Sequence, residues 1–354
     1  MDRAIAQWLQ QTGQPASKLP TLKLPYTIYG HLLLLSQTAF TSPEWKQVKH
    51  ELNNDLSTLY PILATHLKIT HIAINSAIPP SVSDNVNHEE DNILRSPSNL
   101  NPIYGDFGPN TASSHPTNSD FTAAFWTTAK QNGIQQTWTP RWTMFSRGNV
   151  SEKARLLDLP SVHLAVEEGK ASGAGSCAVD LFVGIGYFAF SYLKAGVRVV
   201  VGWDLNPWSV EGLRRGAEAN GWDEQVGEAV SAGGEARLLV FNEGNENAGR
   251  RIGEMRARLP PVRHVNCGLL PTSRASWRTA VEVLDPELGG WVHVHENFAV
   301  AEIESRAEDV REAFQGLCGG REVRIDHVNR LKSYAPGVMH CVIDLHVSPR
   351  CNAE

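Results

Sequence analysis

Two short segments of the sequence combine acidic residues with glycines in a spacing that suits a nucleoside-containing ligand. Residues 180–186 read DLFVGIG, so an acid in an apolar run precedes two glycines that let the backbone approach a ligand closely. A second apolar run, 199–203, ends directly before Asp204, where a carboxylate is able to accept both hydroxyl protons of a ribose. The pattern predicts that Asp180, Gly184, Gly186 and Asp204 bind an adenosine-containing cofactor.

NAD and S-adenosylmethionine both satisfy this pattern. A dinucleotide needs three spaced glycines at a helix N-terminus to seat its pyrophosphate, and here Ala189 occupies the third position. Some dinucleotide enzymes tolerate alanine there, so the spacing alone leaves NAD open. The acid before the glycine loop, together with Asn206 and Pro207 after Asp204, favours the sulfonium cofactor.

The elements that position these residues alternate between strand and helix. Apolar runs predict strands at 178–183, 197–203, 237–241, 264–270, 290–295, 322–328 and 340–347, and helices at 187–194, 207–220 and 301–316. Asn206, Pro207 and the pair Asn220-Gly221 are start and stop signals for the second helix. No helix pattern separates the last two strands, which predicts an antiparallel hairpin at the edge of a mostly parallel, Rossmann-like α/β sheet.

The preceding half of the chain predicts a separate N-terminal α+β domain. Apolar residues recur at helical spacing around 5–9, 32–40 and 48–59, and a strand pattern covers 71–75. Residues 96–120 have the composition of an ordered loop, and the acidic, Gly/Ala-rich span 223–236 that of a solvated insertion. We therefore expect an N-terminal domain at 1–125, a connecting segment at 126–176 and a cofactor-binding domain at 177–354.

Composition excludes several other classes of protein. The 354 residues carry a net charge of −6, so any nucleic-acid contact must come from a local basic patch. Five scattered cysteines without a CxxC pair argue against structural zinc and disulfides. His293 and His295 alternate along a predicted strand and face the same side, but no third metal ligand is evident. We expect no metal, no membrane span, no signal peptide and a cytoplasmic location.

Further motifs surround the glycine loop and carry a family resemblance. They are TMFSRGN at 143–149 followed by Glu152 and Lys153, GLLPTS at 268–273, HVHEN at 293–297 and RLKSYAP at 330–336. With 180–188 and 204–207, they closely resemble the wybutosine-synthesising aminocarboxypropyltransferases, which are relatives of the tRNA guanosine-37 N1-methyltransferases. Segments 92–97 and 104–108 are similar to the fungal form, so the resemblance extends from about Leu24 onward.

This resemblance implies a class I transferase that moves the 3-amino-3-carboxypropyl group of S-adenosylmethionine. The implied acceptor is C7 of 4-demethylwyosine, at position 37 in the anticodon loop of phenylalanine tRNA. A sulfonium offers three carbons to a nucleophile, and the enzyme selects one by orientation. Many base-amine methylases grip the target amine with a polar residue before Pro-Pro and an aromatic; segment 268–273 lacks this motif, and a carbon nucleophile needs none.

The resemblance also implies roles for single residues. Ser146 and Lys153 would contact the cofactor, with Lys153 facing its carboxylate, and Asp204 would hold the ribose. The family's Asp-Asn pair on the adenine side corresponds to Gly244 and Asn245, so the acid is lost unless Glu243 substitutes through a register shift.

The resemblance implies that the domain at 1–125 engages tRNA and that the domain at 177–354 is catalytic. The candidate contacts with tRNA are basic and aromatic residues. Arg141, Arg147, Arg155, Arg330 and Lys332 could reach phosphates, and Trp138, Trp142 and Tyr334 could stack on bases. No residue is named as a catalytic base, although His295 and Asn297 lie near the carboxyl end of a predicted strand.

Three other functions stay open at this point. One is guanosine-37 methylation, which segments 144–149 and 268–273 argue against. Another is a tRNA-binding protein whose catalysis has lapsed, for which Gly244 is the argument. The last is a NAD-dependent enzyme.

Overall fold

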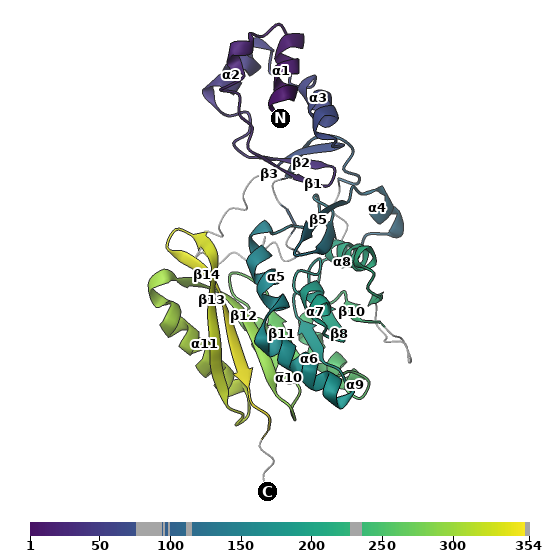
Figure 1. Ribbon diagram of the computed structural model, residues 1–354, viewed down its shortest axis with the longest axis vertical. Helices are drawn as coiled ribbons and strands as arrows, with labels where there is room; N and C mark the ends of the chain where they lie inside the picture. Colours follow the sequence, from purple (N-terminus) through teal and green to yellow (C-terminus); the bar gives the residue numbers. More distant parts are fainter. Residues whose placement is uncertain (76–93, 95, 98–99, 111–114, 227–235, 351–354) are drawn as a thin grey trace. The chain divides into compact units, whose positions relative to one another are not determined.

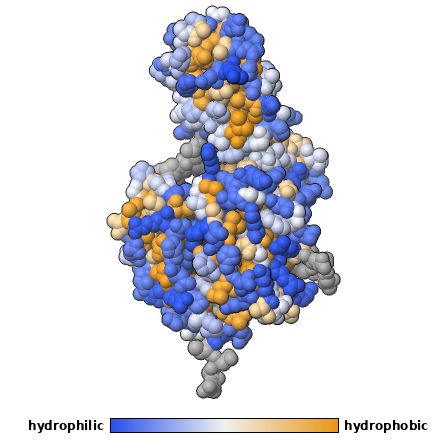
Figure 2. All heavy atoms as spheres, in the orientation of Figure 1, coloured by the Kyte–Doolittle hydropathy of each residue, from blue (hydrophilic) through white to orange (hydrophobic). Residues whose placement is uncertain are grey.

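The computed structural model describes residues 1–75, 94, 96–97, 100–110, 115–226 and 236–350 (Figure 1). It divides into two compact units. The first comprises residues 1–129 and 137–145, and the second residues 130–136 and 146–354. Among the described residues, no helix combines the length and the apolar character that crossing a membrane requires. Hydrophobic side chains lie among mostly hydrophilic ones on the visible face of both units (Figure 2).

The first unit packs three helices on a small sheet and has the expected α+β composition. Its elements are α1 (Asp2–Gln11), α2 (Pro43–Glu51) and α3 (Leu59–Leu67), with strands β1 (Tyr26–Tyr29), β2 (Leu32–Ser36), β3 (His71–Asn75) and β4 (Leu100–Tyr104) in that spatial order. Trp8 of α1 and Trp45 of α2 are buried with their ring centroids 6.0 Å apart, at the centre of the apolar core.

The expectation of helical structure for residues 32–40 is wrong. Residues 32–36 form β2, which pairs antiparallel with β1 and parallel with β3. A run of four leucines fits a buried strand as well as a buried helix, and periodicity alone does not separate the two. Gly30 allows the reversal between β1 and β2, because it adopts a left-handed φ of 51°.

Two stretches that the composition marks as loops contain regular structure. Within 96–120, β4 pairs with β3, and α4 (Asn118–Ala123) begins at a capping box formed by Thr117 and Asp120. Within 223–236, β9 (Glu224–Val226) adds a parallel edge strand to the large sheet. Tertiary pairing thus overrides local composition at both places. Residues 92, 93 and 95 of the 92–97 segment, and residues 227–235, lie outside the described residues.

The second unit is built on an eight-stranded sheet. Its spatial order is β13 (Val323–Ala335), β14 (Val338–Val347), β12 (Gly290–Ala299), β11 (Val262–Cys267), β7 (Cys177–Asp180), β8 (Val199–Trp203), β10 (Leu238–Phe241) and β9. The strands from β12 to β9 are parallel, whereas β14 is antiparallel to both β12 and β13. The expected Rossmann-like sheet with an antiparallel edge hairpin is confirmed.

Helices cover both faces of this sheet (Figure 1). One apolar core lies under α5 (Val150–Leu157), α6 (Pro160–Ser172), α7 (Ala189–Ala195) and α8 (Pro207–Asn220). The other lies under α9 (Ala248–Met255), α10 (Trp277–Val283) and α11 (Ile303–Leu317). Of these, α5, α6, α9 and α10 are not predicted from the sequence. The hairpin β5 (Thr127–Gln131) and β6 (Ile134–Trp138) precedes α5.

The signals for α8 act as predicted. The Asn206 side chain accepts a hydrogen bond from the Trp208 amide, Pro207 takes the first helical position, and Gly221 ends the helix at a φ of 70°. Gly316 lies inside α11 and has a helical backbone. Neither glycine would bring an added Cβ within 4 Å of a neighbour, so only the backbone conformation distinguishes them.

We therefore expect the same substitution to have opposite effects at these two positions. Gly221→Ala forces a left-handed alanine and lowers the free energy of unfolding by about 1–2 kcal/mol. Gly316→Ala raises it by about 0.5–1 kcal/mol, because glycine is costly inside a helix. Urea denaturation of both variants at pH 7 checks this, and a shift in the same direction for both would contradict it.

Candidate active site

The predicted cofactor residues lie at the carboxyl ends of the parallel strands of the second unit. From the central β7 the chain adds β8 and β10 on one side and later returns to place β11 on the other. Ligands of open α/β sheets bind above such a switch point. The loops after β7, β8, β10 and β11 therefore form the frame of the site.

Asp180 ends β7 and is completely buried. Its Oδ1 accepts hydrogen bonds from the Phe182 amide at 3.2 Å and from Asn266 Nδ2 at 3.4 Å. Its Oδ2 has no partner among the described residues. Burial raises the pKa of this carboxyl to about 7. A buried oxygen in this condition is a candidate for pairing with a ligand.

The glycine loop depends on conformations that other residues adopt rarely. Gly184 and Gly186 have φ values of 53° and 88°. At Gly186 a Cβ would also come within 2.7 Å of the Phe190 ring, so both space and conformation require glycine there. The loop consequently presents bare backbone on the side of Asp204.

Asp204 joins this loop to the start of α8. Its Oδ2 accepts a hydrogen bond from the Gly184 amide at 2.9 Å, and its Oδ1 accepts one from the Asn206 amide at 2.8 Å. The side chain is only partly buried. Because each carboxylate oxygen has two acceptor positions, this geometry leaves room for hydroxyl donors from a ligand.

The loop after β10 carries Gly244 and Asn245. The Asn245 side-chain amide donates to the Leu181 carbonyl at 2.9 Å, which ties this loop to the end of β7. Glu243 forms an ion pair with Arg251 at 2.8 Å, and this hydrogen bond lowers the pKa of Glu243. Glu243 is thus engaged with α9, and the register shift that would let it replace the missing acid is not observed.

Ser146 and Lys153 lie together around Tyr187, which follows the glycine loop. The Ser146 amide donates to the Tyr187 hydroxyl at 2.7 Å, and Lys153 Nζ lies 5.0 Å from the centre of the Tyr187 ring. Lys153 is buried and donates to the side-chain oxygens of Gln131 and Gln136. Residues 146–153 of the first motif and the segment 180–188 therefore meet within the second unit.

Lys332, which the sequence predicts as a phosphate contact for tRNA, bonds residues beside Ser146 and Lys153. Its Nζ donates to Asn149 Oδ1 at 2.9 Å and to Ser146 Oγ at 3.4 Å. Burial, followed by the charge of Lys332, lowers the pKa of Lys153 to about 7, and burial lowers that of Lys332 as well. Burial disfavours the charged form of both lysines. When both are protonated they form a local positive centre, which an anionic group would stabilise.

A β-bulge separates Lys332 from Arg330. The register of β13 against β14 shifts between these two residues, so Arg330 pairs with Cys341 and Lys332 with His340. Residues two apart on a regular strand share a face, and a bulge redirects one of them. Arg330 is accordingly exposed and bonded to Glu304 of α11, while Lys332 reaches Ser146.

Arg155 occupies a buried ion network. Its guanidinium bonds Glu152 and Asp344, each at 2.6 Å, and Asp344 also accepts from His293 at 2.7 Å. Burial alone would raise the pKa of Asp344, but its hydrogen bonds with His293 and Arg155 and the charge of Arg155 hold that pKa well below its usual range. The structure therefore does not present Arg155 on a surface, whereas Arg147 is exposed. Trp138 is also buried, with its ring stacked on that of Phe145.

Several polar residues at this end of the sheet were missed or not assigned from the sequence. His295 Nδ1 lies 3.0 Å from His340 Nε2, and the Phe188 ring lies 5.0 Å from that of His295. Asn266 and Asn149 were also missed. The available signal was the two-residue spacing of polar side chains along β12 and β14.

In the part of the chain that is described, no three His, Cys, Asp or Glu side chains are grouped to hold a metal ion.

The loop after β11 is fixed by Glu296, which faces the other side of β12. Its Oε1 accepts hydrogen bonds from Thr272 Oγ1 at 2.9 Å, the Ser273 amide at 2.8 Å and Ser273 Oγ at 3.2 Å. Segment 268–273 therefore has a defined conformation without a Pro-Pro-aromatic sequence.

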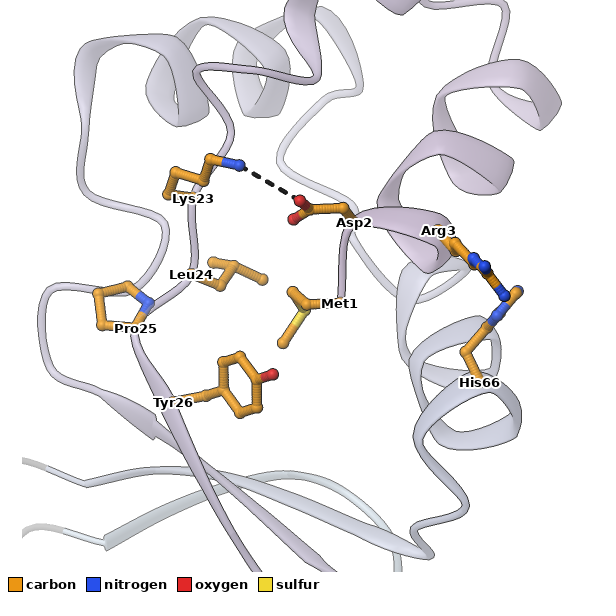
Figure 3. A pocket seen from close by; sticks show the side chains of 8 residues that line it. All are labelled: Met1, Asp2, Arg3, Lys23, Leu24, Pro25, Tyr26 and His66. Carbon is orange, nitrogen blue, oxygen red and sulfur yellow. Dashed lines mark hydrogen bonds and ion pairs between the residues drawn. The ribbon is translucent and has the colours of Figure 1, made fainter.

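A pocket of 640 Å³ lies in the first unit (Figure 3). It is lined by Met1, Asp2, Arg3, Lys23, Leu24, Pro25, Tyr26 and His66. Lys23 and Asp2 form an exposed ion pair at 3.4 Å at its side. None of the predicted site residues lines this pocket.

Comparison with known proteins shows the family. No family model matches the chain. It is 40% identical over 326 residues to tRNA wybutosine-synthesizing protein 2 of Schizosaccharomyces pombe, covering 90% of this chain and 72% of the relative. It is 32% identical over 378 residues to the protein of that name from Saccharomyces cerevisiae, covering 93% and 75%. The chain belongs to the tRNA wybutosine-synthesizing protein 2 family. The family and the transferase class predicted from the sequence are thereby confirmed.

Solved structures show that this member of the tRNA wybutosine-synthesizing protein 2 family has the expected fold. A structure of Pyrococcus horikoshii TYW2 in complex with MeSAdo has a TM-score of 0.64 at 18% identity, covering 99% of this chain and all of that one. A complex of aTrm5 and tRNALeu has a TM-score of 0.55 at 16% identity, covering 92% and 73%. These identities are low, so the two structures support the fold alone.

The ion network of Arg155 generates a stability prediction. Arg155→Met leaves Glu152 and Asp344 without their cation in a buried position, and we expect a loss of about 3–5 kcal/mol in the free energy of unfolding. The matched change, Arg330→Met, removes an exposed ion pair and costs at most about 1 kcal/mol. Guanidinium unfolding of both variants measures the difference. Equal, small losses would show that the buried network contributes little.

Proposed function

We propose that this chain transfers the 3-amino-3-carboxypropyl group of S-adenosylmethionine to C7 of 4-demethylwyosine at position 37 of phenylalanine tRNA. Family membership supports a transferase of wybutosine synthesis. The observation that carries the choice of group is the positive centre formed by Lys153 and Lys332 beside Ser146. The group that moves bears a carboxylate, which a methyl group lacks.

The residues of the second unit fit the donor at several points. Asp204 is a partly exposed carboxylate to which ribose hydroxyls could donate, and Gly184 and Gly186 present bare backbone beside it. Asp180 has an unpaired buried oxygen close to the same loop. Lys153 and Lys332 would hold the carboxylate, and Asn245 would lie on the adenine side, where Gly244 supplies no side chain. The predicted domain limits at 1–125, 126–176 and 177–354 stay a prediction.

The transfer needs little help from protein acids or bases. When bound, the sulfonium supplies an electrophilic carbon and a good leaving group. The protein's task is to orient one of three carbons toward the base, and orientation accounts for most of the rate. Anchoring the carboxylate at Lys153 and Lys332 fixes the amino-acid arm. Segment 268–273 supplies no amide side chain to grip an exocyclic amine, in agreement with a carbon nucleophile.

For tRNA we propose the anticodon loop of phenylalanine tRNA as the partner. Arg147 is exposed directly beside Ser146, and Tyr334 is exposed at the tip of the β13–β14 hairpin. A cationic and an aromatic side chain of this kind suit a phosphate and an unstacked loop base. Arg330 is exposed as well, and its bond to Glu304 would have to open for it to contact a phosphate.

Two other functions give distinct outcomes. One is a guanosine-37 methyltransferase: the fold resembles that of the Methanocaldococcus jannaschii tRNA m1G37 methyltransferase, with a TM-score of 0.54 and 13% identity. That likeness concerns the fold alone. A tRNA-binding protein without catalysis would bind the RNA and show no turnover.

The deciding experiment separates the carbons of the donor. The chain is incubated with tRNA that carries the tricyclic precursor and with S-adenosylmethionine labelled either in the methyl or in the amino-acid carbons. We expect label from the amino-acid carbons in the RNA and formation of 5′-methylthioadenosine. Methyl label in the RNA would establish a methyltransferase, and binding without transfer would establish a lapsed enzyme.

The carboxylate role of Lys153 predicts proton uptake on binding. A lysine with a pKa near 7 is partly neutral at neutral pH, and an adjacent carboxylate favours its charged form. Donor binding should therefore take up protons at pH 7.5, and donor affinity should fall as the pH rises above 7. Calorimetry in two buffers of different ionisation enthalpy measures the uptake.

Two controls isolate this effect. 5′-Methylthioadenosine has no carboxylate and should bind without proton uptake. Lys153→Met should abolish the uptake for S-adenosylmethionine while leaving 5′-methylthioadenosine affinity within a few-fold. Equal uptake for both ligands would contradict the assignment of the carboxylate to Lys153.

A further inference from the structure

Two buried histidine side chains, His295 of β12 and His340 of β14, bond each other and no other group among the described residues. His295 Nδ1 lies 3.0 Å from His340 Nε2, and both side chains are 1% exposed. The other ring nitrogens, His295 Nε2 and His340 Nδ1, have no partner among the described residues. Both amide atoms of the Asn297 side chain, two residues along β12, are likewise buried and unpaired.

The neighbouring histidine pair shows that this arrangement is not imposed by the sheet. His264 Nδ1 lies 3.0 Å from His293 Nε2, so the second pair has the same separation. In the His264–His293 pair, however, both outer ring nitrogens have partners. His264 Nε2 lies 3.2 Å from the Ser161 carbonyl oxygen, and His293 Nδ1 lies 2.7 Å from Asp344 Oδ1. A buried polar group without a partner is destabilising, because it has lost its hydrogen bonds to water. The unpaired nitrogens at His295 and His340 therefore point to a role in function.

The His295–His340 pair borders the proposed donor site. Val294, the residue before His295, pairs with Cys267 at the end of β11, so His295 lies at the carboxyl edge of the sheet. The His295 ring contacts Phe188, which directly follows the glycine loop and Tyr187. His340 pairs across the ladder with Lys332, whose ammonium reaches Ser146.

We infer that His295, backed by His340, accepts the proton that the substrate base loses in the transfer. This inference rests on the proposed function. The base carbon supplies the electron pair of the new C–C bond, and the C–S bond breaks with its electron pair moving to sulfur, which leaves as the neutral thioether. The same base carbon still bears its hydrogen, and loss of that hydrogen as a proton restores the aromatic ring. His295 Nε2 takes this proton, while His295 Nδ1–H is hydrogen-bonded to His340 Nε2.

The surroundings keep the pair in a form that is able to accept a proton. Burial, followed by the charges of His293, Arg155 and Lys332, lowers the pKa of His295 to about 3. Burial and the charges of His295 and Lys332 lower that of His340 to about 3, against an opposing effect of Glu152. A neutral imidazole of low basicity is sufficient, because the alkylated cationic ring is a strong acid.

The carboxylates nearby are less suited to this task. Glu296 already accepts three hydrogen bonds on one oxygen from the loop after β11, and Asp204 accepts two backbone bonds. Asp180, with one unpaired oxygen, is the rival acceptor. It differs in ending β7, just before the glycine loop, so replacing it should weaken donor binding, whereas replacing His295 should not.

The test uses the full chain with a His295→Ala variant and precursor tRNA. We expect kcat for aminocarboxypropyl transfer to fall about 100-fold, the loss typical of a missing general base. The dissociation constant for S-adenosylmethionine should stay within twofold. Added imidazole should restore at least a tenth of the lost rate, and deuterium at C7 of the base should produce a primary isotope effect on kcat that the unaltered chain lacks.

His264→Ala is the matched control, because it removes an equally buried imidazole from an equally close pair. It should reduce stability, yet show neither imidazole rescue nor an isotope effect. Nitrogen-15 NMR of the unaltered, ligand-free chain gives a readout independent of activity and of variant folding. We expect Nδ1 of His295 to carry the proton and Nε2 to be bare.

Three results would overturn the inference: a protonated Nε2, an unchanged kcat in His295→Ala, or a loss of kcat without rescue or isotope effect. If the unaltered chain transferred the methyl group instead, the proposed function would fail first. If it transferred the amino-acid arm and His295→Ala were fully active, only the role of His295 would fail. Rescue of an Asp180 variant by formate, with His295→Ala active, would assign the proton to Asp180.

Discussion

The carboxylate of Asp344, held between Arg155 and His293, ties helix α5 to the antiparallel edge of the large sheet. Glu152 and Arg155 lie one turn apart on α5, and their bonds to Asn329 and Asp344 fix the helix against β13 and β14. Lys153 lies between these two anchors in the sequence. Its position beside Tyr187 therefore depends on an ion network that includes neither Lys153 nor any loop residue.

The buried and half-buried basic residues around α5 differ in their partners: Arg155 bonds carboxylates, whereas Lys153 and Lys332 bond neutral oxygens. Arg155 faces two carboxylates, and such a network is costly to break although it need not be strongly stabilising as a whole. Lys153 and Lys332 bond neutral amide and hydroxyl oxygens, including Gln136 and Asn149. One buried and one half-buried lysine thus lie near a network whose carboxylates already accept hydrogen bonds. On the proposed function, the carboxylate of the donor would add an anionic partner for these lysines.

Most of the parallel sheet and the cofactor loops could be predicted from the sequence, because their signals are local. Asn206, Pro207 and Gly221 mark a helix within a single segment, and Asp204 follows its strand directly. The residues that come together across the antiparallel edge could not be predicted in the same way. Whether Lys332 faces Ser146 depends on the β-bulge after Arg330, and the sequence RLKSYAP gives no sign of that extra residue. The run of leucines at 32–35 failed for a different reason, since its apolar pattern suits two kinds of buried element.

The two lysines come from distant parts of the chain, one on α5 and the other on the hairpin that β13 forms with β14. During synthesis on the ribosome, α5, the glycine loop and the parallel strands emerge long before that hairpin does. A nascent chain that has reached β12 already contains the segments expected to hold the nucleoside, but it lacks Lys332, His340 and the Asp344 anchor. On the proposed function, the two lysines that would hold the amino-acid arm are therefore brought together only when the β13–β14 hairpin docks on the sheet.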